Sequence, residues 1–132
     1  MSLHVRIPPY QHPRNAWRKS IHAEAVKVAQ THGVSYQAED KLELIITLYL
    51  DETEIRFHDV DNRLKDIMDA LQGRAGGPKV ERQMRPIIPN DYQVFRVSIE
   101  KIIPPGQSHN MGHLKIKRYR RNANNTSEGI CR

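Results

Sequence analysis

A chain of 132 residues, 38% of them apolar, is long enough for one domain around a single core. No apolar run approaches the roughly 20 residues that cross a bilayer, and no signal peptide precedes the first strand-like segment. We therefore expect no membrane span and a cytoplasmic location. The single cysteine, Cys131, agrees with this because it cannot form an internal disulfide.

The net charge of +6 is concentrated at one end of the chain. Residues 104–132 contain six lysines and arginines and one acidic residue, a net charge of +5. Basic ends commonly bind polyanions, and nucleic acid is the usual partner. The alternative is a solvated, disordered end without a binding role.

The first predicted elements are a strand and a helix. Leu3–Ile7 alternates apolar and polar residues, which is the period of a half-buried strand, and Pro8 and Pro9 end it. A helix is predicted from about Asn15 to His32, with Gly33 as its stop. Its apolar stripe, spaced by three and four residues, consists of Trp17, Ile21, Ala25 and Val28. The stripe places Trp17 in the core.

The rest of the chain predicts two longer strands, one helix and a short strand. Residues 41–50 are rich in Leu, Ile, Thr and Tyr and predict a strand. A helix is expected over 62–72, with Leu64, Ile67, Met68 and Leu71 as its apolar stripe. Residues 87–88 predict a short strand, and 92–103 alternates as the last long strand. Residues 104–132 show no sustained period and predict a mobile, disordered tail.

This order predicts an α/β (α+β) fold with a small mixed β-sheet of about four strands and two main helices packed on it. The domain would span residues 1–103, followed by the basic tail of 104–132.

Two aspartates before the second helix are the strongest candidates for chemistry. Asp59 and Asp61 are two residues apart in an extended segment, so their side chains point the same way. Two carboxylates at such a short distance repel each other unless a cation lies between them or one of them is protonated. Oxygen ligands in such an array suit Mg²⁺ or Mn²⁺.

Helical spacing adds a lysine to this pair. Lys65 lies four residues after Asp61, and Asp69 four after Lys65, so all three share one stripe. A lysine beside a metal-bound phosphate could stabilise the charge that develops during cleavage. The alternative interpretation is a routine helix start, in which Asp61 or Asn62 caps the helix and a surface ion pair follows.

A calcium-binding EF-hand loop is excluded, although D-x-D-N resembles its start. Counted from Asp59, that loop needs Gly at position six and Glu at position twelve. The chain has Leu64 and Ala70 there.

At these residues the chain resembles the RusA family of Holliday-junction resolvases, small nucleases of bacteria and their phages, including prophages. The family motif is D-x-D-N, then Lys, then D-A-L, then an acidic pair at the start of a strand. The matching residues here are Asp59-Val60-Asp61-Asn62, Lys65, Asp69-Ala70-Leu71 and Asn90-Asp91. The resemblance covers roughly residues 3–103.

The resemblance implies an Mg²⁺-dependent (or Mn²⁺-dependent) endonuclease, a crossover junction endodeoxyribonuclease acting in DNA recombination and repair. It implies a homodimer that binds a four-way DNA junction and makes paired symmetric nicks, with no membrane and no small-molecule cofactor involved. Carried over, Asp59, Asp61 and Asp91 are the metal ligands and Lys65 is the catalytic lysine. His58 could act as a general base, although no histidine is required.

Basic residues are the candidates for DNA contact. They are Arg56, Lys79, Arg82, Arg85, Lys115, Lys117, Arg118, Arg120 and Arg121. Two other functions stay open. One is a DNA-binding module of the same fold that no longer cuts, with Asn90 replacing an acid as a sign of decay. The other is a small basic RNA-binding protein.

Overall fold

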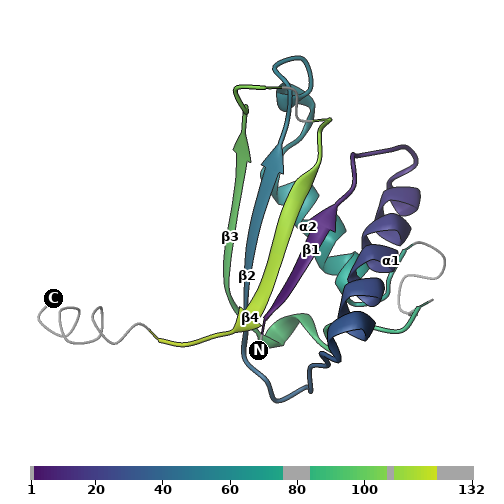
Figure 1. Ribbon diagram of the computed structural model, residues 1–132, viewed down its shortest axis with the longest axis vertical. Helices are drawn as coiled ribbons and strands as arrows, with labels where there is room; N and C mark the ends of the chain where they lie inside the picture. The colour runs from purple at the N-terminus through teal and green to yellow at the C-terminus, as the bar shows by residue number, and fades with distance from the viewer. Residues whose placement is uncertain (1, 76–83, 107–108, 122–132) are drawn as a thin grey trace, which may run out of the picture.

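The computed structural model describes residues 2–75, 84–106 and 109–121. These form a four-stranded mixed sheet with two helices packed on one of its faces (Figure 1). The predicted fold class is therefore confirmed. The strands are β1 (Leu3–Ile7), β2 (Leu42–Tyr49), β3 (Val94–Ile102) and β4 (Gly112–Arg118).

The helices are α1 (Arg14–His32) and α2 (Val60–Leu71), and two 3₁₀ turns, η1 (Ile55–Phe57) and η2 (Asp91–Gln93), precede α2 and β3. Gly33 ends α1 with a φ of 64°, a left-handed conformation that glycine adopts without the steric cost of a Cβ. The predicted helix stop is therefore confirmed.

The strand order is β1-β4-β2-β3. β4 pairs antiparallel with both β1 and β2, and β2 pairs parallel with β3, so β3 is an edge strand. The parallel β2–β3 pair needs a crossover, and α2 supplies it. Because α2 returns the chain from the end of β2 to the start of β3, the two ends of α2 lie near opposite ends of the sheet.

Alternation in the central strands decides which face is buried. In β2, Leu42, Leu44, Ile46 and Leu48 are buried on the helix side, and Leu44 and Ile46 register with Ile116 and Leu114 of β4. Trp17 and Ile21 of α1 and Ile67 and Leu71 of α2 close the same core. Trp17 is 2% exposed, which confirms its prediction as a core residue.

The predicted mobile tail of 104–132 is wrong for residues 112–118, which form β4 between β1 and β2. The segment Gly-His-Leu-Lys-Ile-Lys-Arg alternates with period two, and Leu114 and Ile116 are almost fully buried. The lysines between them point to the other face of the sheet, so a strand with a buried apolar face can still carry basic side chains. The last residues of the predicted tail, 122–132, lie outside the described residues.

The predicted short strand at Ile87–Ile88 is also wrong, since these residues form a bend. Their backbone N–H groups donate to the Leu71 carbonyl oxygen at the end of α2, at 2.7 and 3.0 Å, rather than to a strand. Pro86 and Pro89 flank the segment and cannot donate to a sheet ladder. Ile88 nevertheless contributes a fully buried side chain to the core.

Candidate metal and nucleic-acid site

The exposed start of α2 carries three of the four predicted catalytic residues. Asp59 is the residue immediately before the helix, Asp61 lies in its first turn, and Lys65 follows one turn later. All three are exposed. The helix periodicity places Asp61 and Lys65 next to each other on the surface.

Asp59 occupies the N-cap position, which the sequence had assigned to Asp61 or Asn62. Its side chain makes no capping hydrogen bond to the helix backbone. One carboxylate oxygen instead accepts a long hydrogen bond, 3.5 Å, from the Asn62 side-chain amide. The Asp59 carboxylate therefore does not cap the helix and is available to a ligand.

The surface ion pair expected for a routine helix is also not formed between the described residues. Asp69 forms its ion pair with Arg18 of α1, at 3.3 Å, and not with Lys65. No described residue forms an ion pair with Asp59, Asp61 or Lys65. Within the described part of the chain, these three charged side chains are therefore exposed to solvent without an opposite charge beside them.

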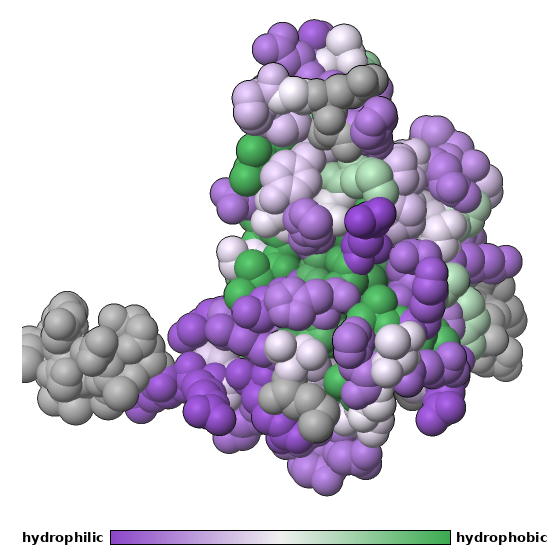
Figure 2. Space-filling model, in the orientation of Figure 1, coloured by the Kyte–Doolittle hydropathy of each residue, from purple (hydrophilic) through white to green (hydrophobic). Residues whose placement is uncertain are grey.

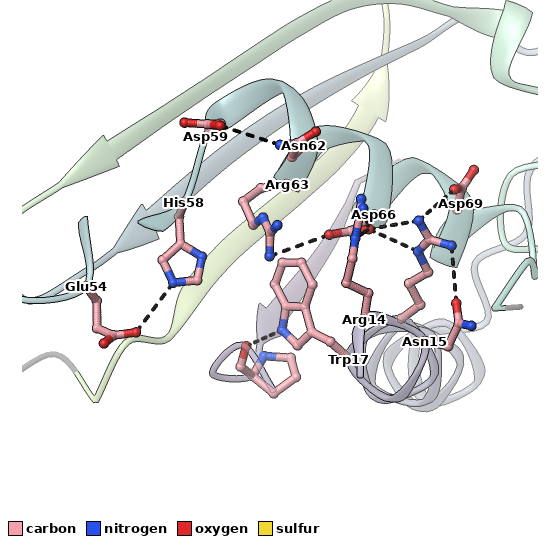
Figure 3. A network of polar contacts seen from close by, with 12 residues as sticks. Arg14, Asn15, Trp17, Glu54, His58, Asp59, Asn62, Arg63, Asp66 and Asp69 are labelled. Atoms are coloured by element: carbon pink, nitrogen blue, oxygen red, sulfur yellow. Dashed lines mark hydrogen bonds and ion pairs between the residues drawn. The ribbon is translucent and has the colours of Figure 1, made fainter. Parts of the chain in front are cut away.

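Beneath this surface, one buried carboxylate holds α1 and α2 together (Figure 3). Asp66 is fully buried, and its Oδ1 accepts hydrogen bonds from Arg14 Nε and Nη2 at 3.0 and 2.8 Å and from Arg18 Nε at 3.0 Å. The bond to Asp66 raises the pKa of Arg14. A buried charge is tolerated only when it is paired and hydrogen-bonded, so this network fixes the relative position of the two helices.

Arg63 adds a third arginine to the network from the first turn of α2. Its Nη1 lies 3.6 Å from the second Asp66 oxygen, while its guanidinium carbon lies 4.2 Å from the Tyr10 ring centroid and 5.6 Å from that of Trp17. Arg63 is 7% exposed. Arg63 and Asp66 were missed in the sequence analysis because charged side chains usually face solvent. The three-residue step between them, continuing to Ile67 and Ala70, is the signal that could have shown a shared buried face.

His58 is buried next to this network and is a structural neighbour of the aspartates. Its ring packs edge-on against Tyr10, with centroids 5.1 Å apart, and its Nε2 lies 3.5 Å from a Glu54 carboxylate oxygen. Burial lowers the pKa of His58 below its usual value, so the ring is neutral at pH 7. Together these contacts fix the segment that leads into Asp59.

Asp91 lies at the other end of the sheet, at the start of η2 and just before β3. The preceding Asn90 has a local structural role, since its N–H donates to the Gln93 side-chain oxygen at 2.9 Å and its amide donates to the Tyr92 hydroxyl at 3.2 Å. The buried Gln93 donates to the carbonyl oxygens of Gln37 and Asp40, at 2.7 and 2.8 Å, ahead of β2. Asp91 itself is exposed.

A single chain does not bring the three predicted metal ligands together. Near the start of α2, Lys101 at the far end of β3 donates from Nζ to the Ile55 carbonyl oxygen at 3.0 Å. Lys101 and Val94 are seven residues apart on one strand, about 23 Å at strand rise, and Asp91 precedes Val94. Consistently, no group of three or more Asp, Glu, His or Cys side chains among the described residues is placed to hold a metal ion.

The predicted DNA-contacting residues of β4 lie on the sheet face that the helices leave open. Lys115 and Lys117 alternate with the buried Leu114 and Ile116, so they point away from the helices. Beyond them, a shallow hollow of about 560 Å³ is lined by Ser2, Glu43, Arg96, Lys117, Arg118, Arg120 and Arg121. Hydrophilic side chains gather at the end of this face where β4 leaves the sheet (Figure 2).

Not all of this positive charge is available to a ligand. Glu43 forms ion pairs with Arg96 and Lys117, at 3.7 and 3.8 Å, and Arg118 pairs with Asp40 at 2.8 Å. Arg120 and Arg121 are exposed, and no described residue forms an ion pair with either. These two arginines are therefore the stronger candidates for phosphate contact.

The other predicted DNA contacts are distributed differently. Arg56 is exposed on η1, close in sequence to the aspartates, and Arg85 is exposed in the segment that follows α2. The Arg85 carbonyl oxygen lies 2.6 Å from His22 Nε2 of α1. Lys79 and Arg82 lie outside the described residues.

No protein-family model matches the chain, and no curated protein matches it significantly. Neither helix of the described residues combines the length and the apolar character that spanning a membrane requires.

Proposed function

We propose that this chain is a metal-dependent endonuclease that nicks branched DNA, with Asp59 and Asp61 as metal ligands at the start of α2. The observation that carries the proposal is the state of Asp59, an N-cap residue whose carboxylate makes no capping bond. Together with the exposed Asp61, it presents two carboxylates to solvent without an ion-pair partner among the described residues. Two exposed carboxylates two residues apart at a helix start could together hold a cation.

The surroundings suit the chemistry of phosphodiester hydrolysis. Mg²⁺ or Mn²⁺ held there would lower the pKa of a bound water and polarise the phosphoryl oxygen. Lys65, one turn beyond Asp61, would place an ammonium beside the phosphate as negative charge develops. The buried arginine network under α2 would hold these side chains in a fixed geometry, which catalysis requires.

Nicking of a labelled four-way junction in Mg²⁺ and in a chelator tests this proposal. We expect cutting by the native chain in Mg²⁺ and none by D59N or D61N, each of which should bind the junction at least as tightly. E24Q, the same change on α1, serves as the matched control and should cut normally. Normal cutting by D59N and D61N would remove these residues from the site.

A DNA-binding module without nuclease activity is the second candidate, and the basic hollow favours it. Both functions predict that R120Q/R121Q weakens binding to all DNA forms. The slope of log affinity against log salt should then flatten by about 0.9 for each duplex phosphate that the protein no longer neutralises. Only the nuclease also predicts Mg²⁺-dependent nicks. Preference for structured RNA over junction and duplex DNA would instead support the small RNA-binding protein.

A further inference from the structure

Two aromatic side chains meet at the surface near the start of β3 and the end of β4, which lie at the same end of the sheet (Figure 1). Phe95 is 54% exposed, and its ring centroid lies 5.5 Å from that of Tyr119, with 39° between the two planes. The Tyr119 N–H donates to the Lys41 carbonyl oxygen at 2.8 Å, which continues the β2–β4 pairing by one residue. The sheet itself therefore holds the two rings together.

A β-bulge accounts for the exposure of Phe95. Leu42 of β2 registers with Val94 of β3, and Glu43 registers with Arg96, so Phe95 is an extra residue with no partner in β2. A bulge turns a side chain out of the regular alternation, and bulges are frequent at sheet edges and next to functional sites. The backbone thus presents a large apolar ring to solvent, where a ligand can cover it.

A basic side chain lies against each of the two rings. Lys41 Nζ is 5.2 Å from the Phe95 ring centroid, and the Arg96 guanidinium carbon is 5.0 Å from the Tyr119 ring centroid. Both distances are within the range of cation–π interaction. Lys41 and Arg96 are exposed, so each can contact an anion while it stays beside a ring.

The aromatic pair borders the basic hollow at the end of β4. Arg120 and Arg121 follow Tyr119 directly, and both line this hollow. The acids beside it are Glu43 and Asp40, and each already forms an ion pair with a basic side chain. The positive charge of the two arginines is therefore available to a ligand that also covers the rings.

Basic side chains continue from this hollow across the open face of the sheet. His4 registers with Lys115 and Arg6 with His113, and all four line a second hollow of about 310 Å³. Within the described ranges, neither Arg6 nor Lys115 forms an ion pair. From β3 to β1 the sheet has three strand spacings, about 14 Å. The open face thus offers several phosphates a path away from the rings.

A surface with exposed rings beside available cations fits a ligand that has flat faces and negative charge. Unpaired nucleotides have both, because every base has a π face and every linkage carries a phosphate. In a duplex the neighbouring base pairs cover those faces, so mainly the phosphates and the groove edges remain for contact. The surface therefore selects a single strand over a duplex.

We propose that this surface binds single-stranded DNA, with bases stacked on Phe95 and Tyr119 and phosphates held by Arg120 and Arg121. It lies at the start of β3, whereas Asp59 begins α2 near the other end of that strand, so it is separate from the site proposed for cutting. The choice of DNA over RNA rests on the proposed function. The stacking surface stands on the contacts of the two rings alone.

Binding of a labelled oligothymidylate of about ten nucleotides, measured by fluorescence anisotropy in a chelator, tests the stacking. An abasic strand of equal length keeps the phosphates and lacks the rings. The native chain should bind the thymidylate strand at least about tenfold more tightly than the abasic strand. F95L and Y119L should each remove about tenfold of this affinity and leave abasic binding unchanged.

Conservative variants separate stacking from a structural role of the two rings. F95W and Y119F keep an aromatic ring and should bind the thymidylate strand within about threefold of the native chain. F57L is the matched control, because Phe57 is 69% exposed on η1, away from the start of β3, and it should bind normally. R120Q/R121Q should weaken binding of the thymidylate and abasic strands alike, since it removes phosphate contacts only.

Photo-crosslinking locates the bases directly. Iodouracil placed in the strand and irradiated in complex with the native chain should couple to Phe95 or Tyr119, identified by mass spectrometry of the peptides. Cross-links confined to other residues, or equal binding of the thymidylate and abasic strands, would overturn the stacking surface. Tighter binding of oligouridylate would overturn DNA as the occupant. Because binding is measured in a chelator, a chain that never cuts DNA can still confirm this surface.

Discussion

Replacing Asp66 by alanine tests how the site is held in place. The carboxylate is fully buried and accepts three hydrogen bonds from Arg14 and Arg18, with Arg63 3.6 Å away. A hydrogen bond to a charged group contributes about 1.5–3 kcal/mol. The three bonds do not add in full, because two of them come from Arg14, whose side chain is 43% exposed. The buried Arg63, 8% exposed by its side chain, would also lose its counter-ion.

Loss of one partner from a buried pair costs about 3–5 kcal/mol, and we expect D66A to lower the free energy of unfolding by this amount. D66N should lose less, because the amide oxygen still accepts one bond. D69A is the matched control on the same helix, since Asp69 contacts Arg18 at 3.3 Å but is partly exposed, and should cost less than about 1 kcal/mol.

Urea unfolding followed by the fluorescence of Trp17 measures these changes, since this single tryptophan is almost fully buried. The slope of the free energy against urea should stay constant across the variants, so that the shift in midpoint reports stability. If the free energy of unfolding of D66A lay within about 1 kcal/mol of that of the native chain, Asp66 would not be the main link between α1 and α2.

Three further predictions concern β4, Lys65 and Tyr36. Deleting residues 107–132 should prevent folding, measured by circular dichroism, because it removes β4, whereas deleting 122–132 should leave the melting temperature within a few degrees. K65A should slow nicking at saturating protein about a hundredfold with unchanged junction affinity, and a change in affinity alone would make Lys65 a simple phosphate contact. Burial raises the pKa of Tyr36 to about 12, so ionisation favours the unfolded chain, in which a tyrosine titrates near pH 10. Stability should therefore fall by about 2–3 kcal/mol between pH 10 and 12, and Y36F should remove this dependence in urea titrations.

The sequence predicted those elements whose signals are local. The end of α1 at Gly33 and the apolar stripe of α2 depend on residue type and spacing alone, and both agree with the structure. β4 was missed because it offers only two large apolar residues, Leu114 and Ile116, among basic ones. A short alternating segment of this kind becomes a strand only when neighbouring strands accept its hydrogen bonds, which is tertiary information.

The candidate site was predictable in its residue types but not in its geometry. The extended segment predicted for Asp59 and Asp61 is wrong, because Val60 already begins α2 and Asp61 lies in its first turn, so alternation no longer places the two side chains on one side. The position of Asp91 could not be predicted without the β2–α2–β3 crossover, because this connection places Asp91 at the end of the sheet opposite to Asp59. The burial of Asp66 depends on arginines about 50 residues away on α1, and no pattern within α2 reveals them.

The proposed nuclease is tested most directly by a cleavage time course on a four-way junction with each strand labelled in turn. We expect Mg²⁺-dependent nicks in two opposing strands at symmetric positions, little cutting of plain duplex, and complete loss of cutting in D59N/D61N. No cleavage in Mg²⁺ or Mn²⁺, or cleavage that persists in D59N/D61N, would contradict it.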